Sequence, residues 1–292
     1  MADAATNPVT STLERLVTGG GVLCDGAMGT MLLARGFELE LCYEELNLSR
    51  PEMVANIHSA YLLAGAEMVK TNTFGANVFR LQRHGLHARV AEINRAGVQL
   101  ARACALQSDG VCVAGSVGPL GVRAEPAEAR AAFAEQVRGL AGVDLLMIET
   151  MMSLEEAAEA MGAAHDVAPE LRLVVTMTVD QAGNCLDGTT PEAAAARLTE
   201  LGADVVGCNC GLGPESVLRA VERMRTATRL PLAALPSAGL PRTVNGRGMG
   251  PVSPEEMASW TRRLAQAGAS LIGGCCGTTP AHVRAMRVAL EG

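Results

Sequence analysis

The sequence predicts an eightfold β/α (TIM) barrel, and two observations predict it. Short β-branched or apolar runs that end in Gly, Thr, Asn or Asp alternate with longer alanine-rich amphipathic runs. This alternation occurs eight times within 292 residues, which is typical of parallel strands that are each followed by a helix. An open, doubly wound sheet is the alternative architecture for the same pattern.

The expected strands follow one another at regular intervals along the chain. They are residues 21–25, 67–71, 111–116, 144–149, 172–178, 204–209, 230–235 and 270–275. Helices are expected near 51–64, 87–107, 127–141 and 214–227, and further helices should begin at the N-cap residues Ser153, Thr190, Ser253 and Thr279. Residues 1–18 are expected to form an N-terminal extension, and residues 19–292 a single barrel domain.

Composition and net charge limit the classes of function that the protein can have. The chain is 49% hydrophobic and 19% charged, as expected for a globular protein. Its formal net charge of −7 and its 2% aromatic content disfavour binding to nucleic acid. Apolar runs fall short of the roughly 18 residues that cross a bilayer, and the N-terminus lacks the pattern of a signal peptide. We therefore expect a cytoplasmic protein with no membrane or nucleic-acid partner, of undetermined oligomeric state.

The cysteines indicate a metal site. Nine cysteines, an odd number without a secretory signal, argue against a disulfide framework. Five stand singly in apolar surroundings and are expected to be small buried side chains: Cys24, Cys42, Cys104, Cys112 and Cys185. The other four lie in GCNCG and GGCCGT, at the ends of two expected strands. Thiolates from two distant segments that meet in space typically bind a soft metal, most often zinc.

The barrel would bring three of these thiols together, because active sites of this fold lie at the carboxyl ends of the strands. Cys210, Cys275 and Cys276 supply the three protein ligands of a catalytic zinc, whose fourth position stays open. Three thiolates make the site anionic, which suits it to hold an incoming thiol as a thiolate for alkylation. Strand alternation places Cys208 on the same face as Cys210, either as a core residue or as the fourth ligand of a closed, non-catalytic zinc site.

Other residues at strand ends suit an amino-acid substrate. Asp25 and Glu149 can accept hydrogen bonds from a substrate ammonium, although a turn-forming or helix-capping role fits the same residues. Asn72 follows the second expected strand and is a further candidate for substrate contact. Backbone N–H groups for a substrate carboxylate are offered by the loop Gly26, Ala27, Met28, Gly29 and Thr30.

A rival hypothesis rests on lysine chemistry. An aldolase-type barrel needs a lysine that forms a Schiff base, and Lys70 is the only lysine of the chain. It lies one residue before the end of the second expected strand. The histidines fall in expected helices or their flanks, where we expect surface residues rather than ligands.

Several segments together resemble the homocysteine-binding domain of cobalamin-dependent methionine synthase and the related homocysteine S-methyltransferases. They include LCDGAMGTMLLARG, VKTNTFGAN, GSVGPLG, MIETM, GCNCGLGPE and LIGGCCGTTPAHV, and the resemblance runs from about residue 20 to 290. It implies zinc held by Cys210, Cys275 and Cys276, with the sulfur of homocysteine as fourth ligand and methionine as product. It also implies that Asp25 and Glu149 contact the amine of the substrate.

The sequence departs from this family in one place near the metal. Related proteins carry Pro-Asn-Ala-Gly after the seventh strand, where an Asn can bind zinc when substrate is absent. Here the run is Pro236-Ser237-Ala238-Gly239, and serine is a poorer ligand.

The methyl donor is the most open question. The folate, cobalamin and activation domains of methionine synthase do not fit in 292 residues. The EELN and TNTFGA segments favour methylcobalamin carried by a separate corrinoid protein. The alternatives are S-methylmethionine, S-adenosylmethionine and betaine, of which betaine is disfavoured by the scarcity of aromatic rings for a cation cage.

Overall fold

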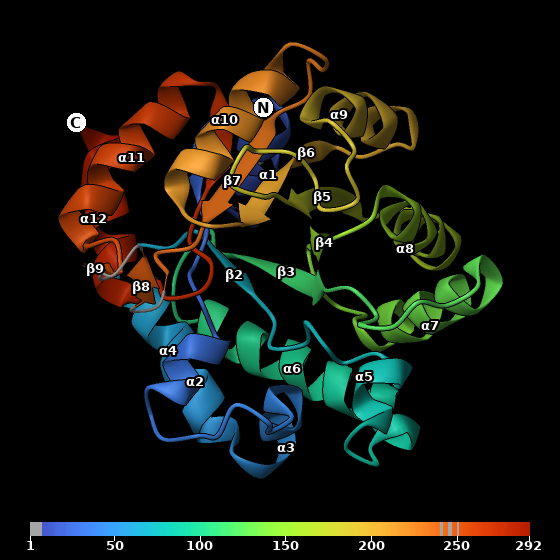
Figure 1. The fold of residues 1–292 in the computed structure, drawn as a ribbon. Coiled ribbons are helices and arrows are strands. Elements are labelled where there is room, and N and C mark those ends of the chain that lie inside the picture. The colour runs from blue at the N-terminus through green and yellow to red at the C-terminus, as the bar shows by residue number, and fades with distance from the viewer. Residues whose placement is uncertain (1–7, 240–241, 245–246, 250) are drawn as a thin grey trace, which may run out of the picture.

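Eight parallel strands form a closed barrel in the computed structural model, which describes residues 8–239, 242–244, 247–249 and 251–292 (Figure 1). The strands are β1 Val22–Leu23, β2 Met68–Lys70, β3 Cys112–Val117, β4 Leu145–Met151, β5 Arg172–Thr178, β6 Val205–Cys210, β7 Leu232–Pro236 and β10 Ala269–Ile272. Their order is β1-β10-β7-β6-β5-β4-β3-β2, and a parallel bridge between Cys24 and Met68 closes the ring. The predicted barrel is therefore confirmed, and the open sheet is excluded.

A ring of helices surrounds the strands (Figure 1). It consists of α4 Pro51–Leu63, α6 Val90–Ala105, α7 Pro126–Gly139, α8 Leu154–Val167, α9 Pro191–Glu200, α10 Pro214–Arg225, α11 Pro254–Gln266 and α12 Pro280–Glu291. Shorter elements enlarge the connections after β1 (α2 Gly29–Leu33, η1 Tyr43–Glu45, α3 Leu46–Ser49) and β2 (α5 Val78–Gln82, η2 His87–Arg89). An antiparallel hairpin, β8 Arg242–Val244 with β9 Arg247–Met249, follows β7.

Local capping explains where several helices begin. The side chains of Ser153, Thr190 and Ser253 each accept a hydrogen bond from a backbone N–H three residues later, as expected of N-caps. Thr279 forms a capping box with His282. The last strand ends at Ile272 rather than at the expected residue 275, although the N–H groups of Gly273, Gly274 and Cys275 still donate to the residues beside them, Ala234, Asp25 and Pro236.

The interior of the barrel is apolar and is closed at the amino-terminal end. Inward side chains of the strands, among them Met68, Leu145 and Leu271, form one cluster, while outward side chains pack against the helices in a second, larger cluster. Helix α1, Pro8–Val17, places its fully buried Leu16 in the inner cluster and lies within the expected extension. Polar side chains therefore gather at the opposite, carboxyl end of the strands.

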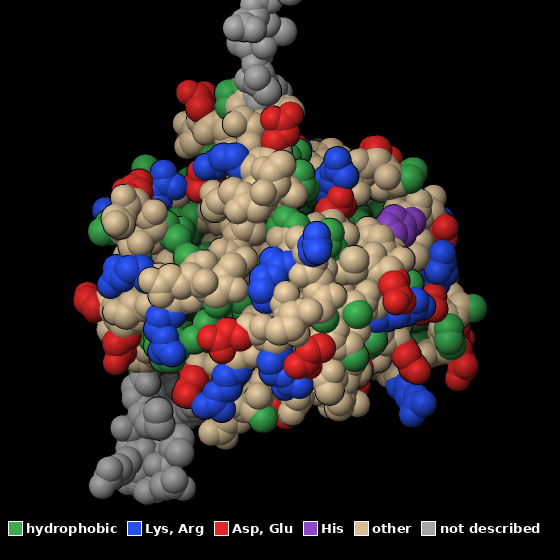
Figure 2. All heavy atoms as spheres, turned by 90° about the horizontal axis from the view of Figure 1, so that it is seen from above, with side chains coloured by type: hydrophobic (Ala, Val, Ile, Leu, Met, Phe, Trp, Pro, Cys, Tyr) green, Lys and Arg blue, Asp and Glu red, His purple; other side chains and the backbone are tan. Residues whose placement is uncertain are grey.

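Charged residues are mixed on the face of the molecule drawn in Figure 2, where basic and acidic side chains alternate rather than gather by sign. Among the described residues, none of the helices is both long and apolar enough to cross a membrane. The expectation of surface histidines is wrong for two residues. His58 is fully buried within α4, and His282 is buried at the start of α12 as part of its capping box.

Candidate active site

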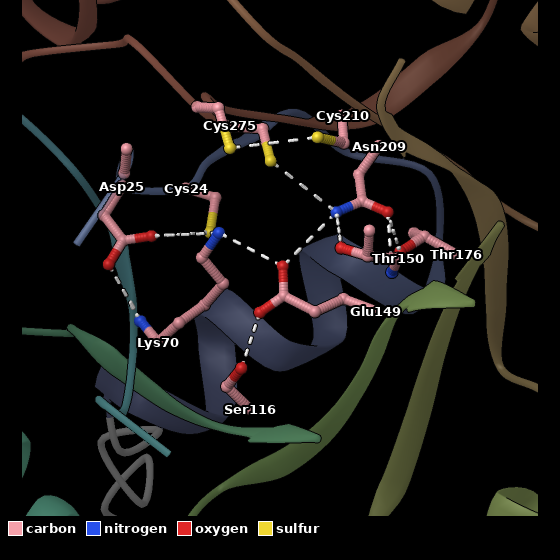
Figure 3. Close-up of polar contacts among 12 residues, drawn as sticks. Cys24, Asp25, Lys70, Ser116, Glu149, Thr150, Thr176, Asn209, Cys210 and Cys275 are labelled. Carbon is pink, nitrogen blue, oxygen red and sulfur yellow. Dashed lines mark hydrogen bonds and ion pairs between the residues drawn. The ribbon is translucent and has the colours of Figure 1, made fainter. Parts of the chain in front are cut away.

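The structure brings together the three cysteines that the sequence singled out, of which Figure 3 labels Cys210 and Cys275. Cys210 is the last residue of β6, and Cys275 and Cys276 follow β10. Their Sγ atoms all lie within 4.8 Å of one another, and those of Cys210 and Cys276 are 3.9 Å apart. Three thiolates on a tetrahedral zinc are about 3.8 Å apart, given a Zn–S bond of about 2.3 Å. The donor atoms and their spacing therefore fit zinc.

Unusual backbone conformations place these thiols. Cys210 has φ of 63°, a left-handed conformation that non-glycine residues rarely adopt and that often marks a functional site. This conformation turns its thiol into the mouth of the barrel instead of the helix layer. Gly273 allows the other two cysteines to approach β1, because a Cβ at this position would lie 2.7 Å from Cβ of Cys24.

Cys208 does not belong to this cluster, and the expectation that it shares a face with Cys210 is wrong. Its buried Sγ lies 3.6 Å from the carbonyl oxygen of Val217 in α10, and it packs in the cluster between strands and helices. The reason is that regular alternation along β6 stops at Cys210. A closed four-cysteine site that uses Cys208 is therefore inconsistent with the structure.

Hydrogen bonds stabilise negative charge on the thiols. Ser237 Oγ donates to Cys210 Sγ over 3.4 Å, and Asn209 Nδ2 donates to Cys275 Sγ over 3.9 Å. Hydrogen bonds from Cys275, Cys276 and Ser237 lower the pKa of Cys210 far below the usual range of a thiol. The same sharing of protons raises the pKa of Cys275, so one thiolate in the cluster is stabilised by the thiols beside it.

A connected layer of polar side chains lies beneath the thiols (Figure 3). Glu149 Oε1 accepts a hydrogen bond from Ser116 Oγ at 2.6 Å, and its Oε2 is 3.4 Å from both Lys70 Nζ and Asn209 Nδ2. Asp25 Oδ2 accepts the backbone N–H of Lys70 at 2.9 Å, while its Oδ1 is 3.7 Å from Lys70 Nζ. Lys70 thus bridges the two acids that the sequence proposed for a substrate ammonium.

The opposite charges in this layer stabilise one another's ionised forms. Burial disfavours the Lys70 ammonium, but the carboxylates of Glu149 and Asp25 outweigh burial and raise the pKa of Lys70 above its ordinary value. Burial raises the pKa of Asp25 to about 6, although the Lys70 ammonium opposes this shift. An amine held protonated in two ion pairs is poorly suited to form a Schiff base, so the geometry disfavours the aldolase hypothesis.

Asn209 connects this polar layer to the thiols through hydrogen bonds. Its Oδ1 accepts hydrogen bonds from the Thr150 N–H at 2.8 Å and the Thr176 hydroxyl at 2.9 Å, and its Nδ2 donates to Thr150 Oγ1 at 2.7 Å. The sequence placed Asn209 at a strand end without a role. Period-two alternation from Val205 could have predicted that its side chain points inward.

A pocket of about 410 Å³ opens above these groups. It is lined by every residue that the sequence proposed for metal or substrate: Asp25, Gly26, Ala27, Met28, Gly29, Thr30, Asn72, Glu149, Cys210, Cys275 and Cys276. Lys70, which the sequence raised only as a candidate for Schiff-base chemistry, also lines the pocket, together with Ser116 and the ring of Phe74, which the sequence did not propose as site residues.

Two of the proposed donors already have partners in the protein. The Ala27 N–H donates to Thr278 Oγ1 at 3.1 Å, and the Asn72 side-chain N–H₂ donates to Tyr43 O at 2.7 Å. The hydroxyl of Tyr61 donates to Ala27 O at 2.7 Å and fixes the loop from below. Asn72 and Tyr61 therefore hold the pocket wall in place.

Comparisons with known proteins agree with this geometry. The family described as homocysteine S-methyltransferase matches residues 22–290. The methionine synthases of Mycobacterium tuberculosis and Mycobacterium leprae are 34% and 33% identical to the chain in alignments of 290 positions, which cover 91% of this chain and 24% of each relative. The chain thus spans about a quarter of the length of these curated relatives.

Among solved structures, the metallated form of the homocysteine methyltransferase MmuM from Escherichia coli superposes with a TM-score of 0.81 and 27% identity. That match covers 97% of this chain and 99% of MmuM. A methyltransferase from Methanosarcina mazei, at 13% identity and a TM-score of 0.62, shares the fold. With its three clustered thiols and a family match along nearly its whole length, the chain belongs to the homocysteine S-methyltransferase family.

Proposed function

We propose that the protein transfers a methyl group to the sulfur of homocysteine and so forms methionine. The observation that carries this proposal is the cluster of Cys210, Cys275 and Cys276 at the wall of an open pocket. Zinc, when held by these three thiolates, would favour the thiolate form of a substrate thiol and so make its sulfur nucleophilic. Family membership and the homocysteine methyltransferase MmuM support the choice of homocysteine.

The residues around the cluster orient the substrate and supply charge. The thiol releases its proton to solvent on binding, its sulfur forms the new bond to the methyl carbon, and the bond between that carbon and the donor breaks with its electron pair on the donor. Asp25 and Glu149 line the same pocket and are the proposed contacts of the substrate ammonium. Ser237 and Asn209 keep the cysteine thiolates oriented through their hydrogen bonds.

We propose a methyl-corrinoid protein as the donor, and the rim of the pocket supports this. Large apolar side chains are exposed on the connections that follow five of the strands: Leu39, Leu41, Val122, Met152, Leu186 and Leu212. Exposed apolar side chains around a binding site are typical of docking surfaces. A donor that carries its methyl group on a macrocycle has to cover the mouth of the barrel from outside.

The aromatic residues of the pocket offer little to a small cationic donor. The rings that line it are Tyr43 and Phe74, and the guanidinium of Arg80 already lies 5.3 Å from the centroid of Phe74. A donor that needs no partner protein, such as a sulfonium, is the second candidate. MmuM is matched over 99% of its length, so a homocysteine methyltransferase exists with little chain beyond this barrel.

The test has two stages. Zinc content and zinc X-ray absorption are recorded on the protein with and without homocysteine, and we expect three sulfur neighbours to become four. Methionine formation is then measured by mass spectrometry with a methylcobalamin-loaded corrinoid protein, S-methylmethionine, S-adenosylmethionine or betaine. Four sulfur neighbours before homocysteine is added, or no change on its addition, would contradict the proposal. Turnover with a sulfonium alone would replace the corrinoid donor by the second candidate.

A further inference from the structure

The two acids of the pocket already have a cation of their own. Lys70 lies on β2, which stands between β1 and β3 in the closed barrel, and Asp25 follows β1. The Lys70 Nζ atom lies 3.4 Å from Glu149 Oε2 and 3.7 Å from Asp25 Oδ1. All three side chains are at least nine-tenths buried. The Lys70 ammonium therefore stands where the ammonium of an amino-acid substrate would meet both acids.

Every oxygen of these two carboxylates has a partner within the protein. Glu149 Oε1 accepts from Ser116 Oγ, and its Oε2 contacts Lys70 and Asn209. Asp25 Oδ2 accepts the Lys70 N–H, and its Oδ1 contacts Lys70 Nζ and the thiol of Cys24 at 3.4 Å. A ligand without an ammonium would leave none of these oxygens unpaired.

Because these carboxylate oxygens already have partners, the site discriminates less strongly between thiols with and without an amine. A site rejects an analogue that lacks a polar group chiefly because buried partners of that group are then left without hydrogen bonds. Here that penalty is absent, and a substrate ammonium would in addition approach the like charge of Lys70. Both effects reduce the advantage of a thiol that carries an α-ammonium over a thiol that lacks one.

We propose that Lys70 is a specificity-determining residue that opens the thiol pocket to thiol carboxylates without an α-ammonium group. The inference rests on the proposed function, because it concerns the thiol that binds beside the three cysteines. Lys70 acts by occupying Asp25 and Glu149, not by contact with the reacting sulfur. Homocysteine remains a substrate, but its amine contributes little to recognition.

The experiment compares homocysteine with 4-mercaptobutanoate, which has the same carbon chain, thiol and carboxylate but no amine. Dissociation constants are measured by calorimetry on the zinc-loaded protein, and X-ray absorption reports whether each thiol adds a fourth sulfur neighbour. The variant Lys70→Met removes the charge at nearly constant side-chain length, and Lys70→Gln is the polar alternative if Lys70→Met does not fold.

In the native protein we expect the two dissociation constants to differ by less than about tenfold. In the folded Lys70 variant, the preference for homocysteine should rise at least about tenfold, because the freed acids then require an ammonium. A native preference for homocysteine of about tenfold or more, or an unchanged ratio in the variant, would overturn this inference and leave the proposed function intact. If neither thiol adds a sulfur neighbour to zinc, the proposed function fails as well.

Discussion

Ser237 holds Cys210 at two points. Its Oγ donates to Cys210 Sγ over 3.4 Å, and its backbone N–H donates to the Cys210 carbonyl oxygen over 3.1 Å. The serine follows β7, which lies between the strand of Cys210 and the strand that precedes the other two cysteines. The next residue, Ala238, donates its backbone N–H to the Cys276 carbonyl oxygen over 2.9 Å, so residues 237–238 contact both halves of the thiol cluster.

Removing this hydroxyl should weaken metal binding. In Ser237→Ala the Cys210 thiolate loses one hydrogen-bond donor and part of its orientation, and loss of such a partner typically lowers metal affinity 10–100-fold. We expect zinc affinity to fall by about tenfold, measured by competition with a chromophoric chelator.

Ser270→Ala is the matched control for this variant. Ser270 is also buried, but its Oγ contacts the Leu232 carbonyl oxygen near the start of β10, away from the thiols. Equal zinc affinities for Ser237→Ala and the native protein would show that Ser237 does not support the metal.

Each of the three clustered cysteines should be required for metal binding. In Cys210→Ser, Cys275→Ser or Cys276→Ser a hard hydroxyl replaces a thiolate, so we expect zinc content to fall from one per chain toward zero while the barrel remains folded. Zinc is measured by atomic emission, and folding by circular dichroism. Full zinc content in any one of these variants would remove that residue from the ligand set.

Cys208→Ala tests the opposite expectation. Because Cys208 packs against α10, its loss should leave zinc content unchanged and lower the free energy of unfolding by about 1 kcal/mol. Loss of zinc in this variant would contradict the position that the structure gives to Cys208.

The exposed apolar rim should matter for a protein donor but not for the thiol. Leu212→Asp or Met152→Asp places a charge on the docking surface, and we expect kcat/KM for the corrinoid protein to fall by about tenfold. Homocysteine affinity should stay unchanged. Leu106→Asp is the control, since Leu106 is also an exposed leucine but follows α6, on the amino-terminal side of the barrel. Similar losses in rim and control variants would argue against docking at the mouth.

Most of the barrel could be predicted because its signals are local. Strand β5 was expected at residues 172–178 and lies there, since an unbroken apolar run stands between clear helix patterns. The last strand was expected to reach residue 275 and is assigned only to Ile272, although the N–H groups of Gly273 and Gly274 still alternate between the two neighbouring strands, to Ala234 O and Asp25 O. Those hydrogen-bond partners are distant in sequence, so the exact end of the strand could not be read from local residues.

The residue types of the site could be predicted from the sequence, but the directions in which some of its side chains point could not. Alternation placed Cys208 beside Cys210, and a single left-handed residue at the end of β6 reversed that result. Lys70 follows alternation from Met68 and so should point inward, yet its two ion pairs require the closed ring that brings Asp25 and Glu149 to it. The identity of a residue does not by itself predict its φ angle or its interaction partner across the barrel.

His58 should make the fold sensitive to acid. It is fully buried in α4, and among the described residues neither of its ring nitrogens has a hydrogen-bond partner. Burial lowers the pKa of His58 to about 4. The unfolded chain binds this proton near pH 6.5, so stability is complete above that pH and falls as the pH decreases toward 4. The loss amounts to about 1.4 kcal/mol per pH unit and about 3 kcal/mol in total.

Urea unfolding at pH 7 and pH 5 tests this linkage. The native protein should lose about 2 kcal/mol through His58 over this interval, and His58→Leu should lose about 2 kcal/mol less, because the leucine binds no proton in either state. His84→Leu serves as control, since His84 is exposed and should leave the native pH dependence nearly intact. If His58→Leu and the native protein lost stability in parallel, the pKa of His58 in the folded state would equal that in the unfolded chain, and burial would not lower it.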